Sequence, residues 1–139
     1  MIEVLSGVLT LQNMMDHKVK QTHDIDFSVE NDLLWDLGDA IISITMQEVD
    51  EYVQFLSAKG TVFGKIKSAT LVSTANQLVY YNAFKKFEDI LPQQMKIFNK
   101  MDSTLEWLGK TNDKEEICLL IDQMKRHPQF EWSRDQDAY

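Results

Sequence analysis

The chain has 139 residues, of which 22 are acidic and 14 are basic, so its formal net charge is −8 at pH 7. This length predicts one domain, and a hydrophobic fraction of 44% is typical of a globular protein rather than a disordered one. The acidic balance disfavours binding to nucleic acids or to an anionic membrane surface, because both contacts depend on lysine and arginine.

Targeting signals and disulfide bonds are not predicted. The longest apolar runs, such as residues 118–121, are too short to cross a bilayer. Glu3 stands where a signal peptide would carry positive charge. A single cysteine, Cys118, cannot form an internal disulfide bond. We therefore expect a cytoplasmic protein that does not enter a membrane.

The spacing of apolar residues predicts five helices along the chain. They are expected at about residues 2–20, 29–59, 61–91, 92–108 and 112–127. Ser28 is a suitable N-cap for the second helix, and Gly60 and Gly109 are suitable stops for the second and fourth. Asn112 with Glu115 resembles a capping box at the start of the fifth. The fifth helix begins with acidic residues and ends with basic ones, and its inward residues are expected to be Ile117, Leu120, Ile121 and Met124.

The second predicted helix is amphipathic on a helical wheel. Its apolar face holds Leu34, Leu37, Ile41, Ile44, Val49, Tyr52 and Leu56. Its opposite face holds Ser43, Gln47 and Gln54 together with four aspartates, Asp32, Asp36, Asp39 and Asp50. We interpret these four aspartates as a solvated interaction face.

Glu48 is an exception, because it projects into the apolar sector of this helix. A carboxylate that faces a core needs a partner. We expect it to pair with a lysine of the third helix or with the hydroxyl of Tyr80 or Tyr81. The functional alternative is a pocket acid.

The third predicted helix has no acidic residue between positions 61 and 87. It carries a series of small side chains, which would let another helix approach closely. These are Ser68, Ala69, Ser73 and Ala75. They predict either close packing within the chain or the contact face of a homodimer.

Together these predictions give an all-α fold. Residues 1–127 are expected to form a single-domain antiparallel bundle of about five helices, of which two are long and central. Residues 128–139 are expected to form a polar tail that is either flexible or docked through Phe130 and Trp132.

Common catalytic and metal-binding motifs are not found. The three histidines, His17, His23 and His127, lack the spacing of a zinc site. Cys118 is predicted to be a small core residue rather than a nucleophile. There is no glycine-rich phosphate loop and no Gly-x-Ser-x-Gly sequence.

Residues 33–39, Leu-Leu-Trp-Asp-Leu-Gly-Asp, resemble the carboxylate helix of the all-α nucleoside triphosphate pyrophosphatases, the MazG-like and dimeric dUTPase group. Leu11, Gln12, Asp16 and His23 are similar to the first helix of its phage-type members. The resemblance covers roughly residues 8–54.

The resemblance implies that Asp36 and Asp39 hold Mg²⁺ and that Glu48 and Glu51 supply a second carboxylate pair. Two departures are visible: the family has glutamate-rich pairs, whereas both first positions here are aspartate. The second pair of the family lies on the following helix, whereas Glu48 and Glu51 belong to the same predicted helix.

Two functions from different classes follow. The first is a small acidic helical protein of bacterial or phage type that binds another protein as an assembly factor, adaptor or inhibitor, without catalysis or cofactor. Its partner is expected to present a basic surface, because an acidic face steers one. The alternative is a Mg²⁺-dependent pyrophosphohydrolase, or a decayed relative, in which the metal and carboxylates activate a water. We predict the first, with or without homodimerisation.

Overall fold

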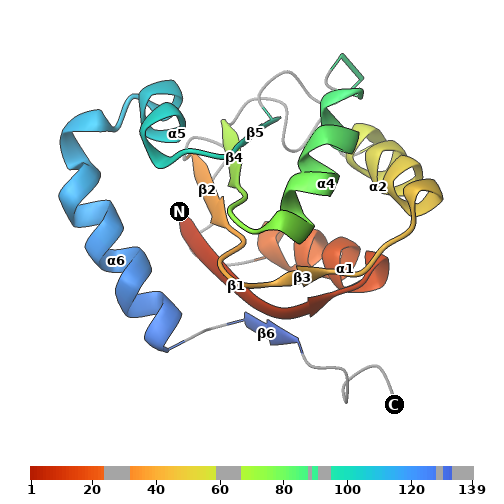
Figure 1. Ribbon diagram of the computed structural model, residues 1–139, viewed down its shortest axis with the longest axis horizontal. Coiled ribbons are helices and arrows are strands. Elements are labelled where there is room, and N and C mark those ends of the chain that lie inside the picture. The colour runs from red at the N-terminus through yellow and green to blue at the C-terminus, as the bar shows by residue number, and fades with distance from the viewer. Residues whose placement is uncertain (24–31, 59–66, 88, 91–94, 128–129, 133–139) are drawn as a thin grey trace.

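Short strands alternate with helices in the computed structural model, which describes residues 1–23, 32–58, 67–87, 89–90, 95–127 and 130–132 (Figure 1). The strands are β1 (Ile2–Leu9), β2 (Leu33–Asp36), β3 (Ile41–Ile42), β4 (Ser68–Leu71), β5 (Met95–Phe98) and β6 (Phe130–Trp132). The helices are α1 (Leu11–Thr22), α2 (Met46–Ala58), α4 (Ala75–Lys85), α5 (Met101–Leu108) and α6 (Lys114–Arg126), with a 3-10 turn, η1 (Thr111–Asp113), before α6.

The strands form one curled parallel sheet. Its main path has the order β3-β1-β2-β4-β5, and β6 pairs with β1. The long strand β1 pairs with β2 through residues 2–4, with β6 through residues 5–7, and with β3 through residues 8–9. Parallel neighbours need a crossover connection: α1 lies between β1 and β2, α2 between β2 and β4, and α4 between β4 and β5.

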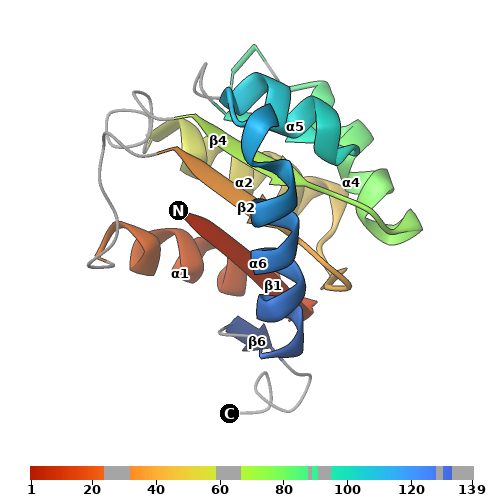
Figure 2. The ribbon, with the colours of Figure 1, turned by 90° about the vertical axis from the view of Figure 1, so that its left-hand side faces the viewer.

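Helices cover both faces of the sheet (Figures 1 and 2). One face is covered by α1, α2 and α4, and the other by α5 and α6. Residues of β2 alternate between the two cores: Leu33 and Trp35 belong to the first, and Leu34 belongs to the second. All four residues of β2 are buried, as expected for a central parallel strand.

The predicted all-α helical bundle is wrong, because the chain forms a mixed α/β fold around a parallel sheet. The physical reason lies in the strands, which are short and buried on both faces. A strand such as Leu33–Asp36 shows no period-two alternation of apolar and polar residues. An apolar run of that length is compatible with a strand or with part of a helix.

Each long predicted helix is divided in the structure. Residues 2–20 contain β1 and most of α1, and residues 29–59 contain β2, β3 and α2. The described part of 61–91 contains β4 and α4, and residues 92–108 contain β5 and α5. The two long central helices are therefore replaced by elements of at most 13 residues among those described. The predicted boundaries Ser28, Gly60 and Pro92 lie outside the described residues.

Several local predictions are confirmed. Val49, Tyr52 and Leu56 are buried on the inner face of α2. Helix α5 ends at Gly109, whose φ of 70° is the left-handed conformation of a C-cap. Helix α6 has acidic residues in its first turn, basic residues in its last turn, and Ile121 buried.

Two details near the C-terminus differ from the prediction. The N-cap of α6 is Asp113, without a side-chain hydrogen bond, rather than an Asn112 capping box. Leu120, predicted to face inward, is 42% exposed. Part of the predicted tail, residues 130–132, forms β6, while residues 128–129 and 133–139 lie outside the described residues. In the described part of the chain, no helix is long and apolar enough to cross a membrane.

Candidate functional site

The four aspartates of the predicted interaction face do not share one helix. Asp32 lies just before β2, and its carboxylate accepts a hydrogen bond from the backbone N–H of Lys67 at 3.1 Å. Asp36 ends β2 and is only 3% exposed. Asp39 is exposed between β2 and β3, and Asp50 is exposed on α2. The helix on which this face was predicted is absent, so the residues are separated.

The carboxylates of the pyrophosphatase resemblance are separated as well. Asp36 and Asp39 flank the turn after β2, whereas Glu48 and Glu51 lie on α2. Glu48 forms a capping box with Thr45: its Oε1 accepts from Thr45 N at 2.9 Å, and its own N–H donates to Thr45 Oγ1 at 3.1 Å. Glu48 thus starts a helix. The all-α fold that the resemblance implies is contradicted by the parallel sheet.

The described residues offer no group of three or more His, Cys, Asp or Glu side chains placed to hold a metal ion. A magnesium site needs several oxygen ligands at one point. Asp36 uses its Oδ1 to accept the backbone N–H of Gly38 at 2.7 Å, which stabilises a turn. This oxygen of the carboxylate therefore serves the turn after β2.

The predicted stripe of small residues is divided between the sheet and a loop. Ser68 and Ala69 belong to β4 and are 3% and 0% exposed. Ser73 and Ala75 are exposed at the start of α4. The four side chains therefore do not form one helix face.

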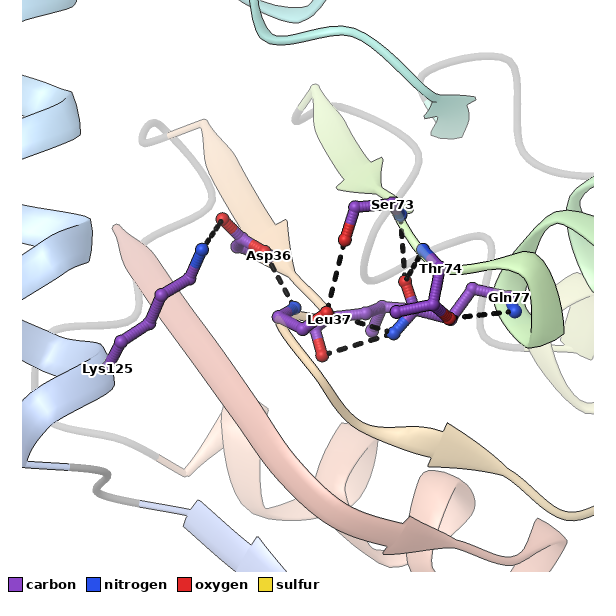
Figure 3. Close-up of polar contacts among 7 residues, drawn as sticks. Asp36, Leu37, Ser73, Thr74, Gln77 and Lys125 are labelled. Carbon is purple, nitrogen blue, oxygen red and sulfur yellow. Dashed lines mark hydrogen bonds and ion pairs between the residues drawn. The ribbon is translucent and has the colours of Figure 1, made fainter.

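A crevice of about 380 Å³ lies where β2 and β4 end (Figure 3). In open α/β sheets, ligands often bind outside the carboxyl ends of the strands. The residues that line this crevice are Val4, Leu5, Ser6, Gly38, Asp39, Ser73, Thr74 and Lys125. Lys125 Nζ reaches from α6 to within 3.7 Å of Asp36 Oδ2, which joins α6 to the end of β2.

Gln77 connects the two loops behind this crevice and is completely buried. Its amide Nε2 donates to the backbone oxygens of Ala40 at 2.7 Å and Gly38 at 3.2 Å. Its Oε1 accepts from the backbone N–H of Ser73 at 2.9 Å (Figure 3). The polar groups of the crevice wall therefore satisfy one another, and the arrangement holds two loops together.

A second cavity, of about 60 Å³, lies between the sheet and helices α1, α2 and α4. Its walls are mostly apolar and aromatic, with a few polar side chains. Tyr52 lines it from α2, and Lys18 lines it from α1. The Tyr52 hydroxyl is buried and has no hydrogen-bond partner among the described residues. Burial raises the pKa of this hydroxyl well above its usual value.

Lys18 belongs to a buried polar cluster, which we call the Glu3 cluster. The cluster consists of Glu3, His17, Lys18, Gln21 and Trp35. Lys18 Nζ donates to Gln21 Oε1 at 3.2 Å and lies 4.1 Å from the centre of the Trp35 ring. Burial lowers the pKa of Lys18 from 10.5 to about 8, although the negative charge of Glu3 acts in the opposite direction.

Sequence reasoning missed the Glu3 cluster and Tyr52 as functional candidates. A signal was present: once a helix begins at Leu11, Met14 and Lys18 lie on one face of it, four residues apart. Lys18 then occupies a position where an apolar residue would be expected. Glu3 similarly interrupts the apolar start of β1, between Ile2 and Val4.

The outer side of α4 carries exposed apolar residues beside β3 and the start of α2. The side-chain amide of Asn76 exchanges two hydrogen bonds with the backbone of Ile42, at 2.8 and 3.1 Å, and so fixes the first turn of α4 to β3. Ile41 on β3 is 49% exposed, Met46 at the start of α2 is 54% exposed and Val79 on α4 is 56% exposed. We call these three residues the α4–β3 surface.

Comparison of the chain with known protein families, curated proteins and solved structures finds no match.

Proposed function

We propose that this protein binds another protein, without catalysing a reaction, through the α4–β3 surface. The observation that supports this is the exposure of Ile41, Met46 and Val79 on three adjoining elements. Exposed apolar side chains that gather on one surface are typical of protein contacts, whereas isolated ones are ordinary. A protein of this kind acts as an assembly factor, an adaptor or an inhibitor.

The partner in this proposal has an apolar centre and a basic rim. Asp50 follows Met46 by four residues, so the two side chains are neighbours on α2. Glu51 is also exposed, and α2 contains no lysine or arginine. An acidic border beside an apolar centre favours a partner with lysine or arginine around its own apolar contact.

A second copy of this chain fits the same surface less well. It would bring a net charge of −8 and the same acidic residues of α2 to the contact. Like charges across an interface disfavour association. We therefore propose a different protein as the partner, and the experiment below also detects a homodimer.

We place this binding in the cytoplasm. Cys118 is a free cysteine, which suits a reducing compartment. The acidic composition also suits a partner that is a basic protein rather than an anionic membrane.

The test compares proteins captured by the tagged full-length chain with those captured by Met46→Glu/Val79→Glu. Both substitutions are at exposed positions, so the fold should be retained, which circular dichroism and thermal unfolding would check. We expect at least one protein to be captured by the wild type and lost by the double variant. The purified partner should then bind the wild type at least tenfold more tightly than it binds the double variant.

The matched control is Val19→Glu, which makes the same change at a 41% exposed position on α1. It should retain the partner. Equal capture by all three proteins would contradict the proposal. Light scattering on the wild type alone would reveal self-association, and loss of a dimer in the double variant would make a second copy the occupant.

A further inference from the structure

We propose that the cavity between the sheet and helices α1, α2 and α4 is a binding site for a short-chain monocarboxylic acid, whose carboxylate accepts a hydrogen bond from the Tyr52 hydroxyl. None of the three residues of the α4–β3 surface lines this cavity.

Tyr52 supplies the first observation. The residue is 3% exposed, it lines the cavity, and its hydroxyl has no hydrogen-bond partner in the described part of the chain. Two other polar residues of the wall already have hydrogen-bond acceptors: the Tyr80 hydroxyl donates to Ile44 O at 2.6 Å, and the Gln77 amide donates to Ala40 O at 2.7 Å. A buried donor without an acceptor costs stability, and a ligand oxygen would remove that cost.

The charge of the wall supplies the second observation. The described residues that line the cavity include two lysines, Lys18 and Lys96, and no aspartate or glutamate. This is unexpected in a chain with 22 acidic and 14 basic residues. Lys96 Nζ lies 5.6 Å from the centre of the Trp107 ring, on the α5 side of the sheet, so Lys18 is the lysine of this pair whose charge faces the cavity. The negative charge of Glu3 offsets only part of the charge of Lys18. The local field therefore favours an anion over a cation.

The size of the cavity and its apolar walls restrict which anions can bind. A water molecule needs roughly 10–15 Å³ of such space, so a cavity of about 60 Å³ accepts about four to six small non-hydrogen atoms. The remaining walls include Leu9, Leu37, Leu56, Val72 and Phe84. A hydrophilic anion such as phosphate would leave its oxygens against these side chains. A carboxylate on a short alkyl chain would place its oxygens at the Tyr52 hydroxyl and its alkyl chain against the apolar side chains.

The experiment titrates the full-length protein with sodium butyrate and follows backbone amide resonances by NMR. We expect saturable shifts at residues that line the cavity. Tyr52→Phe removes the donor and should weaken butyrate at least about tenfold, because a hydrogen bond to a charged group is lost. The same variant should be at least as stable as the wild type without ligand, because its hydroxyl has no partner to lose.

Thr111→Val is the control, since it also removes a hydroxyl, at an exposed position outside the cavity, and should leave the affinity within about twofold. 1-Butanol and butyramide have similar size and no charge, and both should bind at least tenfold more weakly than butyrate. Equal binding of the neutral compounds would overturn the assignment of an acid. Absence of saturable shifts, or an unchanged affinity in Tyr52→Phe, would overturn the site.

Discussion

The Nε2 atom of His17 lies 2.6 Å from Oε2 of Glu3, and both side chains are buried between α1 and the sheet. The same carboxylate oxygen accepts a hydrogen bond from Gln21 Nε2 at 3.0 Å, and Gln21 in turn accepts from Lys18. A single carboxylate therefore compensates a whole set of buried polar groups. Substitutions in this cluster should therefore change the free energy of unfolding.

Glu3→Gln removes the negative charge of the Glu3 cluster while retaining its shape. We expect the free energy of unfolding to fall by about 3–5 kcal/mol, because Lys18 is left as a buried charge without compensation. Urea unfolding monitored by tryptophan fluorescence measures this change. Glu51→Gln, at an exposed position on α2, should change stability by less than about 0.5 kcal/mol. Equal effects of the two substitutions would contradict this account.

The lowered pKa of Lys18 predicts that stability rises with pH above about 8. Below pH 8 the amine is charged in both states, and folding bears the full cost of burying it. Between about 8 and 10.5 the folded protein releases the proton while the unfolded chain retains it, so increasing pH favours the folded state.

Lys18→Met isolates this effect from other titrations. Relative to this variant, the wild type should gain about 2 kcal/mol between about pH 7 and about pH 9.5. Urea unfolding of both proteins at the two pH values provides the comparison. A constant difference between the two proteins would show that burial does not lower the pKa of Lys18.

Gln77→Glu should destabilise the fold by about 3 kcal/mol or more, since a carboxylate oxygen would replace the amide that donates to Ala40 O and Gly38 O. Asn82→Asp makes the equivalent change at an exposed position of the same helix and should cost less than about 0.5 kcal/mol. Chemical denaturation distinguishes the two. Similar small effects would mean that Gln77 does not hold the loops together.

Gly38→Ala tests the turn at the carboxyl end of β2. The φ of Gly38 is 52°, and a Cβ atom there would lie 3.0 Å from the backbone oxygen of Leu5. We expect a loss of about 2–4 kcal/mol, from left-handed strain together with this contact. Gly109→Ala has similar strain with nothing within 4 Å, so it should cost only about 1–2 kcal/mol. Thermal unfolding of both variants measures how much more stability is lost at Gly38, and this difference is the effect of the contact with the Leu5 oxygen.

The sequence contained signals for helix starts that were not used. Thr45 with Glu48 and Thr74 with Gln77 each place an N-cap three residues before a glutamate or glutamine, and the structure has a capping box at both sites. Either motif would have placed a helix start inside a predicted long helix. Breaking those helices would have left short apolar runs before each cap as candidate strands.

The candidate site was harder to predict than the helices. Glu3 lies on β1, Lys18 on α1 and Tyr52 on α2, so each belongs to a different element. Lys18 and Tyr52 line the same cavity. Nothing in the spacing of these three residues indicates that they lie close together. The predicted acidic face failed for the related reason that it assumed one continuous helix from residue 29 to residue 59.

The amino-acid pattern alone determined the inner face of α2, the end of α5 at Gly109, and the charge gradient of α6. These features depend on residues within about four positions of each other, so they can be read locally. The tertiary structure alone decided the sheet, because a parallel strand bonds to a neighbour far away in the chain, as Ile2 does opposite Leu34. Packing of α1 against the sheet likewise brings Lys18 to Glu3, and packing of α2 brings Tyr52 to the cavity that Lys18 lines. No local pattern records these contacts.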